Sequence, residues 1–324
     1  MSNTHDHRAG AMRVAARLAL AVAVLALVLV TAACGGEGTA GNASPSPSES
    51  AGPLSVVDDA GEEVSLAAPA QKVVSLAPAN TEIAFAIGAG DKMVAGTSYD
   101  DYPEEAKALP KIGDFSNPSV EKIIALEPDL VLASGGIQDG LRNKLTKLGV
   151  AVYVVDPTTY DGVISDIGEL GQLLGVEDQA GAVVENMETA KADVVAKVGA
   201  LERPTTFIEI YSQPLMTAGS GSFIDDIVTL AGGTNLGATA GEGFPNFSTE
   251  VLIEEDPAVY IAMSGSMGEP QDIVKRSGYA DLSAVKNDRV YVIEDNIIAR
   301  PGPRLAQGLT EMATMIHPEA FATP

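Results

Sequence analysis

Residues 119–133 read SVEKIIALEPDLVLA, and residues 248–262 read STEVLIEEDPAVYIA. Aligned without a gap, the two stretches share a serine, a glutamate, an isoleucine, a proline and an alanine, and an acidic residue precedes each proline. Both patterns predict a short helix that ends before the proline and a buried strand that follows it. Any helix–proline–strand unit has some of these features. Several identities in one register instead favour two lobes of related build.

The residues around each stretch alternate between short runs of strand formers and helical patterns. This alternation predicts an α/β fold with a largely parallel sheet. The predicted strands are 55–58 and 63–66, which form a hairpin, then 72–76, 93–97, 130–133, 150–155, 206–211, 259–263 and 290–293. The predicted helices are 81–87, 117–127, 141–148 and 304–316, and 223–230 and 251–255 continue the alternation in the second half.

Residues 163–201 carry no strand signal and are typical of two helices split near Gly175. In the second helix, apolar residues from Val183 to Leu201 recur at steps of three and four, which predicts one apolar stripe. Pro204 ends the pattern. About 24 residues of helix would span about 36 Å, long enough to join two lobes. We therefore predict an N-terminal lobe at 54–160, connecting helices at 161–203 and a C-terminal lobe at 204–324.

The first 33 residues have the pattern of an export signal. Three arginines between positions 8 and 17 precede an apolar run at 18–30, and Thr31-Ala32-Ala33-Cys34 follows. The run has 13 residues, fewer than the roughly 18 expected of a membrane-spanning helix. The segment resembles a bacterial lipoprotein signal, in which Cys34 is acylated and becomes the N-terminus, although Thr31 stands where leucine is usual. An uncleaved anchor or a plain signal peptide is the alternative.

Residues 34–53 are rich in glycine, serine and proline and contain almost nothing to bury, which predicts a flexible, lipid-anchored linker. The whole chain has 20 basic and 44 acidic side chains, a formal charge of −24. An acidic surface of this kind disfavours nucleic acid and anionic lipid head groups as partners.

Few side chains of the chain suit a bare metal ion. Cys34 is the only cysteine, so no disulfide is expected, and beyond the signal only His317 remains of the three histidines. Zinc and nickel prefer imidazole and thiolate ligands. We therefore predict no metal site and no cofactor, and a metal already wrapped in an organic chelate fits better as a ligand. Ferric ion on tyrosine and carboxylate oxygens stays open.

Each half of the repeat places one glutamate at the start of its helix, Glu121 and Glu250. A matched pair of carboxylates on separate lobes suits docking onto a symmetric partner with two cationic sockets. The alternative is that each carboxylate only complements its helix dipole, an effect worth about 0.3–1 kcal/mol.

Three segments carry a resemblance to a known family: VSLAPANTE at 74–82, TSYDDYP at 97–103, and residues 117–133. They resemble the iron-siderophore, haem and cobalamin binding proteins of ABC importers, and the similarity covers about residues 54–321. The resemblance implies a class III periplasmic binding protein fold, in which one long helix joins two Rossmann-like lobes and the ligand cleft lies between them. It also implies that Glu121 and Glu250 pair with arginines on the permease subunits.

The resemblance extends to the ligand cleft through Tyr99, Phe115 in GDFSNP and Phe244 in GFPNFS. Where the cobalamin-binding members of this family carry tryptophans, this chain has phenylalanines, and it contains no tryptophan. These rings could stack on a flat macrocycle, and Tyr211 is a further candidate in the second lobe. The alternative for each ring is an ordinary place in the core. Arg300 could bind a ligand carboxylate or phosphate bidentately.

Two other classes of protein compete with an importer component. A secreted α/β hydrolase needs a nucleophile in G-x-S-x-G and a histidine base; residues 219–222 and 265–268 both miss this spacing, and only His317 could act as the base. An adhesion lipoprotein would need a large exposed apolar patch. We therefore predict a monomeric, extracytoplasmic, lipid-anchored binding protein, not an enzyme. It captures a ferric siderophore, haem or cobalamin-like chelate and delivers it to ABC permease and ATPase subunits.

Overall fold

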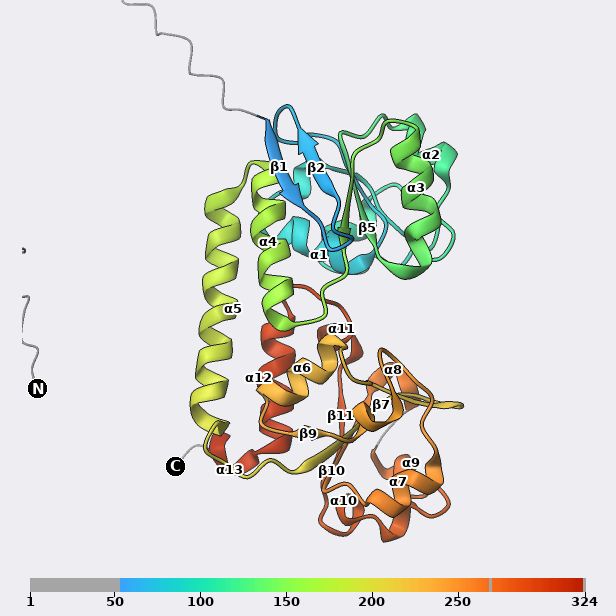
Figure 1. Ribbon diagram of the computed structural model, residues 1–324, viewed down its shortest axis with the longest axis vertical. Coiled ribbons are helices and arrows are strands. Elements are labelled where there is room, and N and C mark those ends of the chain that lie inside the picture. Colours follow the sequence, from blue (N-terminus) through green and yellow to red (C-terminus); the bar gives the residue numbers. More distant parts are fainter. Residues whose placement is uncertain (1–52, 268–269, 323–324) are drawn as a thin grey trace, which may run out of the picture. The chain divides into compact units, whose positions relative to one another are not determined.

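The computed structural model describes residues 53–267 and 270–322, apart from the side chains of residues 266 and 267 (Figure 1). The predicted signal peptide at 1–33, Cys34 and nearly all of the 34–53 linker lie outside the described residues. A hairpin opens the described part, with β1 (Leu54–Val57) antiparallel to β2 (Glu63–Leu66), as the sequence predicts. Two sheets of mainly parallel strands follow.

The first sheet carries the N-terminal lobe. Its four parallel strands lie in the order β4 (Met93–Ala95), β3 (Val73–Ser75), β5 (Leu130–Ser134) and β6 (Val152–Val155). All four are short and almost fully buried, which explains why their sequences are continuous apolar runs and do not alternate. The Asp58 carboxylate accepts a hydrogen bond from the Val154 amide (3.1 Å), so the hairpin turn is fastened to β6.

The second sheet carries the C-terminal lobe and repeats the strand order of the first. The parallel strands are β9 (Thr234–Asn235), β7 (Thr205–Ser212), β10 (Val259–Met263) and β11 (Val290–Ile293). One strand has no counterpart, because β8 (Leu215–Thr217) turns back antiparallel to β7. Strands β8 and β9, only three and two residues long, were not predicted from the sequence.

The two halves of the sequence repeat occupy equivalent places in the two sheets. Helix α2 (Val120–Ala125) leads into β5, and helix α7 (Thr249–Glu255) leads into β10. Each of these strands pairs on one side with the first parallel strand of its lobe. The residue before each proline adopts positive φ, +48° at Glu127 and +44° at Asp256, so the same turn joins helix to strand in both copies. The repeat is therefore structural, and the predicted α/β fold with two Rossmann-like lobes is confirmed.

Two helices connect the lobes. Helix α4 (Tyr160–Leu174) ends at Gly175, whose φ of +64° is the left-handed cap that glycine adopts without strain. Helix α5 (Glu177–Val198) has 22 residues, about 33 Å of helix, and packs against α4 and against α12 (Leu305–Ile316). The predicted continuation to Leu201 is wrong: the helix ends at Val198, and Leu201 lies beyond it, partly exposed.

The remaining helices flank the sheets, except α13 (Pro318–Phe321), which packs against α5 and α12 (Figure 1). They are α1 (Pro78–Ala86), α3 (Asp139–Lys147), α6 (Phe223–Leu230), α8 (Ser264–Met267), α9 (Pro270–Ile273), α10 (Ser283–Lys286), α11 (Asp295–Ile298), α12 (Leu305–Ile316) and α13 (Pro318–Phe321). Within the residues that the structure describes, none of the helices combines the length and the apolar character that crossing a membrane requires.

Candidate ligand-binding site and docking surface

The loop that carries Tyr99 is held in place by a buried carboxylate. Asp100 is 3% exposed and accepts hydrogen bonds from the Thr97 amide (3.0 Å) and from the Thr81 hydroxyl (2.7 Å). Thr81 lies in α1, so the loop is fastened to the helix that follows β3. The neighbouring Tyr99 side chain is 58% exposed, and therefore this ring is not part of the core.

Phe115 lies in a second loop at the same edge of the N-terminal sheet. The Gln138 side-chain amide, 1% exposed, donates to the carbonyl oxygens of Phe115 and Leu76, both at 2.8 Å. The Ser98 amide donates to the Gly113 carbonyl (2.8 Å). These bonds gather the segments that follow β3, β4 and β5. The Tyr99 and Phe115 loops therefore meet where the parallel strands end, the usual place for a ligand in an open α/β sheet.

In the C-terminal lobe, Tyr211 and Phe244 lie on neighbouring segments. Tyr211, in β7, pairs with Met216 of β8, and Met216 forms a bridge to Asn246, two residues beyond Phe244. The exposed fractions are 48% for Tyr211 and 46% for Phe244, whose ring packs edge-on against Phe223 at 6.5 Å. Three predicted ligand rings are thus substantially exposed, and Phe115 is half-buried.

Arg300 lies in a network of ion pairs between the lobes. Its guanidinium donates to Glu82 in α1 (2.7 Å) and to Asp101 (2.6 Å), and its side chain is 16% exposed. Arg304 binds both oxygens of Glu82 (2.8 and 2.7 Å), and its guanidinium lies 4.2 Å above the Tyr102 ring. The bond from Arg300 lowers the pKa of Asp101. A ligand anion could therefore take the place of Asp101 only by breaking this ion pair.

The two glutamates that the sequence predicts for docking lie on equivalent helices. Ser119 caps α2 by accepting from the Lys122 amide, and Ser248 caps α7 by accepting from the Val251 amide, each at 3.3 Å. Glu121 and Glu250 are the second residues of these helices, and both are exposed. The Ser248 hydroxyl also donates to the Glu250 carboxylate (2.7 Å) and lowers its pKa.

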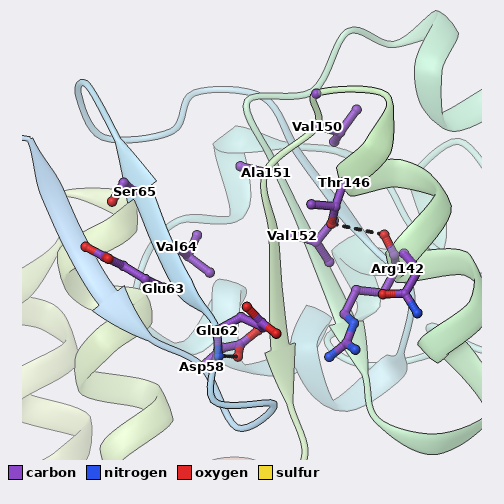
Figure 2. Close-up of a pocket in the computed structure, with 12 residues that line it drawn as sticks. Asp58, Glu62, Glu63, Val64, Ser65, Arg142, Thr146, Val150, Ala151 and Val152 are labelled. Carbon is purple, nitrogen blue, oxygen red and sulfur yellow. Dashed lines mark hydrogen bonds between the residues drawn. The ribbon is translucent and has the colours of Figure 1, made fainter.

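Three pockets among the described residues lie near or apart from the predicted ligand residues, and none of them is lined by one. A pocket of about 580 Å³ is lined by Ser220, Gly221, Glu242 and Gly243, directly before Phe244. A pocket of about 520 Å³ lies in the N-terminal lobe between the hairpin and α3, where Figure 2 shows Arg142 extending toward the side of Asp58 and Glu62. A third, of about 270 Å³, also borders on Arg142. Neither N-terminal pocket contains a predicted ligand residue.

Metal-binding groups are not clustered in the part of the chain that the structure describes. Within residues 53–267 and 270–322, no three or more histidine, cysteine, aspartate or glutamate side chains are arranged to hold a metal ion. His317 is 3% exposed, and its ring lies between the Glu319 carboxylate and the Gly232 carbonyl, at the end of α12. Its surroundings are those of a structural residue.

The arrangement of two related lobes and two helical connectors has counterparts among known proteins. A family model described as a periplasmic binding protein matches residues 73–297, from the start of β3 into α11. The chain belongs to the periplasmic binding protein family. Its members bind solutes, and the chain is therefore a binding protein and not an enzyme, in agreement with the prediction from sequence.

Relatives within the periplasmic binding protein family include importer components. An uncharacterized ABC transporter substrate-binding lipoprotein, YvrC of Bacillus subtilis (strain 168), is 32% identical over 277 residues, which cover 83% of this chain and 87% of the relative. A vitamin B12-binding protein of Yersinia pestis (strain Pestoides F) is 34% identical over 205 residues, 63% of this chain and 73% of that protein.

Solved structures of the family share the fold. The periplasmic vitamin B12 binding protein BtuF of Vibrio cholerae superposes with a TM-score of 0.70 and is 28% identical, covering 79% of this chain and 99% of its own. The periplasmic haem-binding protein RhuT of Roseiflexus sp. RS-1 gives a TM-score of 0.68 at 28% identity, over 77% of this chain and 99% of its own. The class III periplasmic binding protein fold is thus confirmed.

Proposed function

We propose that this chain captures a metal chelate outside the cytoplasm and delivers it to the permease of an ABC importer. The observation that carries the proposal is a set of exposed aromatic rings, Tyr99 on the loop after β4 in one lobe, with Tyr211 near the end of β7 and Phe244 on a neighbouring loop in the other. Large aromatic rings that are about half exposed suit stacking on a flat ligand. The relatives support this function over a secreted hydrolase and over an adhesion lipoprotein.

The ligand is proposed to be a preformed chelate such as a cobalamin, a haem or a ferric siderophore, carried as cargo and not as a cofactor. Relatives named for vitamin B12 and for haem support this class. Tyr99, Phe115, Tyr211 and Phe244 are the proposed contacts. Arg300 could contribute only by exchanging Asp101 for an anionic group of the ligand, because its guanidinium is already bound by two carboxylates.

Absorption titration of the purified chain with cyanocobalamin, haemin and ferrichrome tests the ligand class. We expect a saturable spectral change with one of the three, and about tenfold weaker binding after Phe244→Ala or Tyr99→Ala, which remove an exposed stacking surface. Leu148→Ala is the matched control, because Leu148 is 56% exposed but lies at the end of α3. Absence of binding to all three probes would contradict the proposal.

We also propose that the chain is anchored outside the cytoplasm by a lipid on Cys34, with residues 1–33 removed, 34–53 as a tether, and lobes at 54–160 and 204–324 around connecting helices at 161–203. The B. subtilis relative that is named a lipoprotein supports this proposal. Metabolic labelling with palmitate should label the expressed wild-type chain and not Cys34→Ala, which should leave the membrane fraction. Retention of Cys34→Ala in the membrane would argue for an uncleaved anchor.

The proposed partners are the permease, with its ATPase subunits, and the ligand; the chain itself is proposed to act as a monomer. Glu121 and Glu250 would bind cationic side chains on the two permease subunits. Their exposure, their equivalent positions and their placement on helices that precede different sheets all support this docking role.

A further inference from the structure

The five identities of the internal repeat divide into three that cap a helix, form a turn or fill the core, and two whose side chains are exposed, although Ile253 also packs over Gly278. The serines cap their helices, the prolines follow the positive-φ turns, and the alanines, Ala133 and Ala262, are fully buried in β5 and β10. The remaining identities are the glutamates and the isoleucines. Both isoleucines, Ile124 and Ile253, are substantially exposed, at 40% and 37%.

The two helices have the same pattern of burial. The residue just before each isoleucine, Ile123 or Leu252, is fully buried and fixes that face of the helix against its sheet. The isoleucine is three residues beyond the glutamate, so the two side chains lie on neighbouring parts of the helix surface. We call Glu121 with Ile124, and Glu250 with Ile253, the two contact pairs.

Exposure alone does not demand an apolar residue at these positions. Two other positions are exposed in both helices, and there the copies differ: Lys122 corresponds to Val251, and Ala125 to Glu254. At each of these two positions, one copy has a charged residue and the other copy has an apolar one. The exposed side chains that the two helices share are those of the contact pairs.

We infer that each contact pair forms one complete patch for the permease, in which the aliphatic side chain is buried beside a carboxylate that meets a cation. The inference rests on the proposed function and adds Ile124 and Ile253 to it. The binding partner is a membrane protein with two equivalent binding sites, each formed by a cationic side chain next to an apolar pocket. Burying an aliphatic side chain supplies affinity, whereas a rim charge mainly supplies orientation and rate.

The test measures uptake by host cells that lack the chain and carry variants of it, with labelled cyanocobalamin, haemin or ferrichrome, whichever the purified chain binds. Ile124→Ser and Ile253→Ser are each expected to weaken binding to the permease roughly tenfold, with similar losses of uptake, and the double variant should lose more. Ligand affinity and melting temperature should not change. Leu148→Ser, exposed but outside the contact pairs, should leave uptake intact.

The outcomes separate this inference from the proposed function. Normal uptake by the double isoleucine variant, with uptake abolished in Glu121→Arg/Glu250→Arg, would overturn the inference and leave glutamate docking in place. Normal uptake by that glutamate variant would overturn docking itself. If the serine variants prove unstable, photo-crosslinking residues placed at 124 and 253 test the inference instead. Both should form crosslinks to an identified ABC permease subunit, and a crosslinking residue at 148 should not. Failure at either position would refute the inference.

Discussion

Glu82→Gln is expected to lower the free energy of unfolding by about 3 kcal/mol. The Glu82 side chain is 2% exposed and accepts three hydrogen bonds, one from Arg300 and two from Arg304. Glutamine has the shape of glutamate but no charge. Asp101 would therefore be the only carboxylate left to compensate the charges of two largely buried guanidinium groups. Removing one partner of a buried ion pair typically costs about 3–5 kcal/mol, and the arginines, 16% and 21% exposed, place this case at the lower end.

Urea denaturation followed by circular dichroism measures this loss. Glu104→Gln is the matched control, because Glu104 pairs with Lys107 at 2.6 Å but both side chains are at least half exposed. Such a surface pair contributes less than about 1 kcal/mol. A loss for Glu82→Gln no larger than for the control would mean that the arginines are fully stabilised by solvent and Asp101.

The ion pairs of Glu82 also affect the loop of Tyr99, a predicted ligand contact. Asp101 and Tyr102, two and three residues beyond Tyr99, are held by Arg300 and Arg304 of the C-terminal lobe. The loop that exposes Tyr99 is therefore fastened to both lobes. Weakening the network should loosen this loop as well as the contact between the lobes.

The repeat was predictable because its causes are local. Within 15 residues, the sequence contains a serine that caps the helix, a buried apolar position and a proline after the turn. The same pattern recurs from residue 248. Strands β5, β10 and β11 were predictable for a related reason: buried parallel strands are short apolar runs between turn signals. Helices α2 and α7 followed directly from these patterns.

The Arg300–Glu82 ion pair was not predictable, because its partners are 218 residues apart and nothing in either local pattern depends on the other. For the same reason, the sequence suggested Arg300 as a ligand contact, whereas its environment shows two carboxylates already bound to it. The exposure of Tyr99, Tyr211 and Phe244 also depends on how loops pack. A single sequence leaves stacking rings and core rings indistinguishable.

The second large effect on stability that we expect concerns the buried carboxyl group of Asp166. Asp166, in α4, is 2% exposed, and its Oδ2 has no hydrogen-bond partner, while the Tyr153 hydroxyl lies within bonding distance of both Asp166 (2.9 Å) and Glu169 (2.7 Å). Burial, followed by the negative charge of Asp59, raises the pKa of Asp166 to about 8. At neutral pH the folded chain therefore keeps a proton there that the unfolded chain has lost.

This difference in proton binding makes stability fall as the pH rises. Between the unfolded pKa of 3.8 and the folded pKa of about 8, each pH unit removes up to about 1.4 kcal/mol of the Asp166 contribution. Above pH 8 both states are ionised, and the loss is complete. Asp166→Asn replaces the carboxyl by a group that stays neutral, and should add at least about 2 kcal/mol of stability at pH 8 and almost none at pH 4.

Urea midpoints measured from pH 4 to pH 9 test the Asp166 prediction. Asp193→Asn is the control, an exposed change on α5 that should shift the free energy of unfolding by less than about 0.5 kcal/mol at every pH. The free energy of unfolding of Asp166→Asn should rise steadily relative to the wild type as the pH rises, because the wild type loses stability when Asp166 must ionise. The asparagine amide can donate toward Asp59 while its oxygen still accepts from Tyr153. A constant difference between the two proteins at all pH values would instead mean that Asp166 is already ionised in the folded chain, with Tyr153 supplying its compensation.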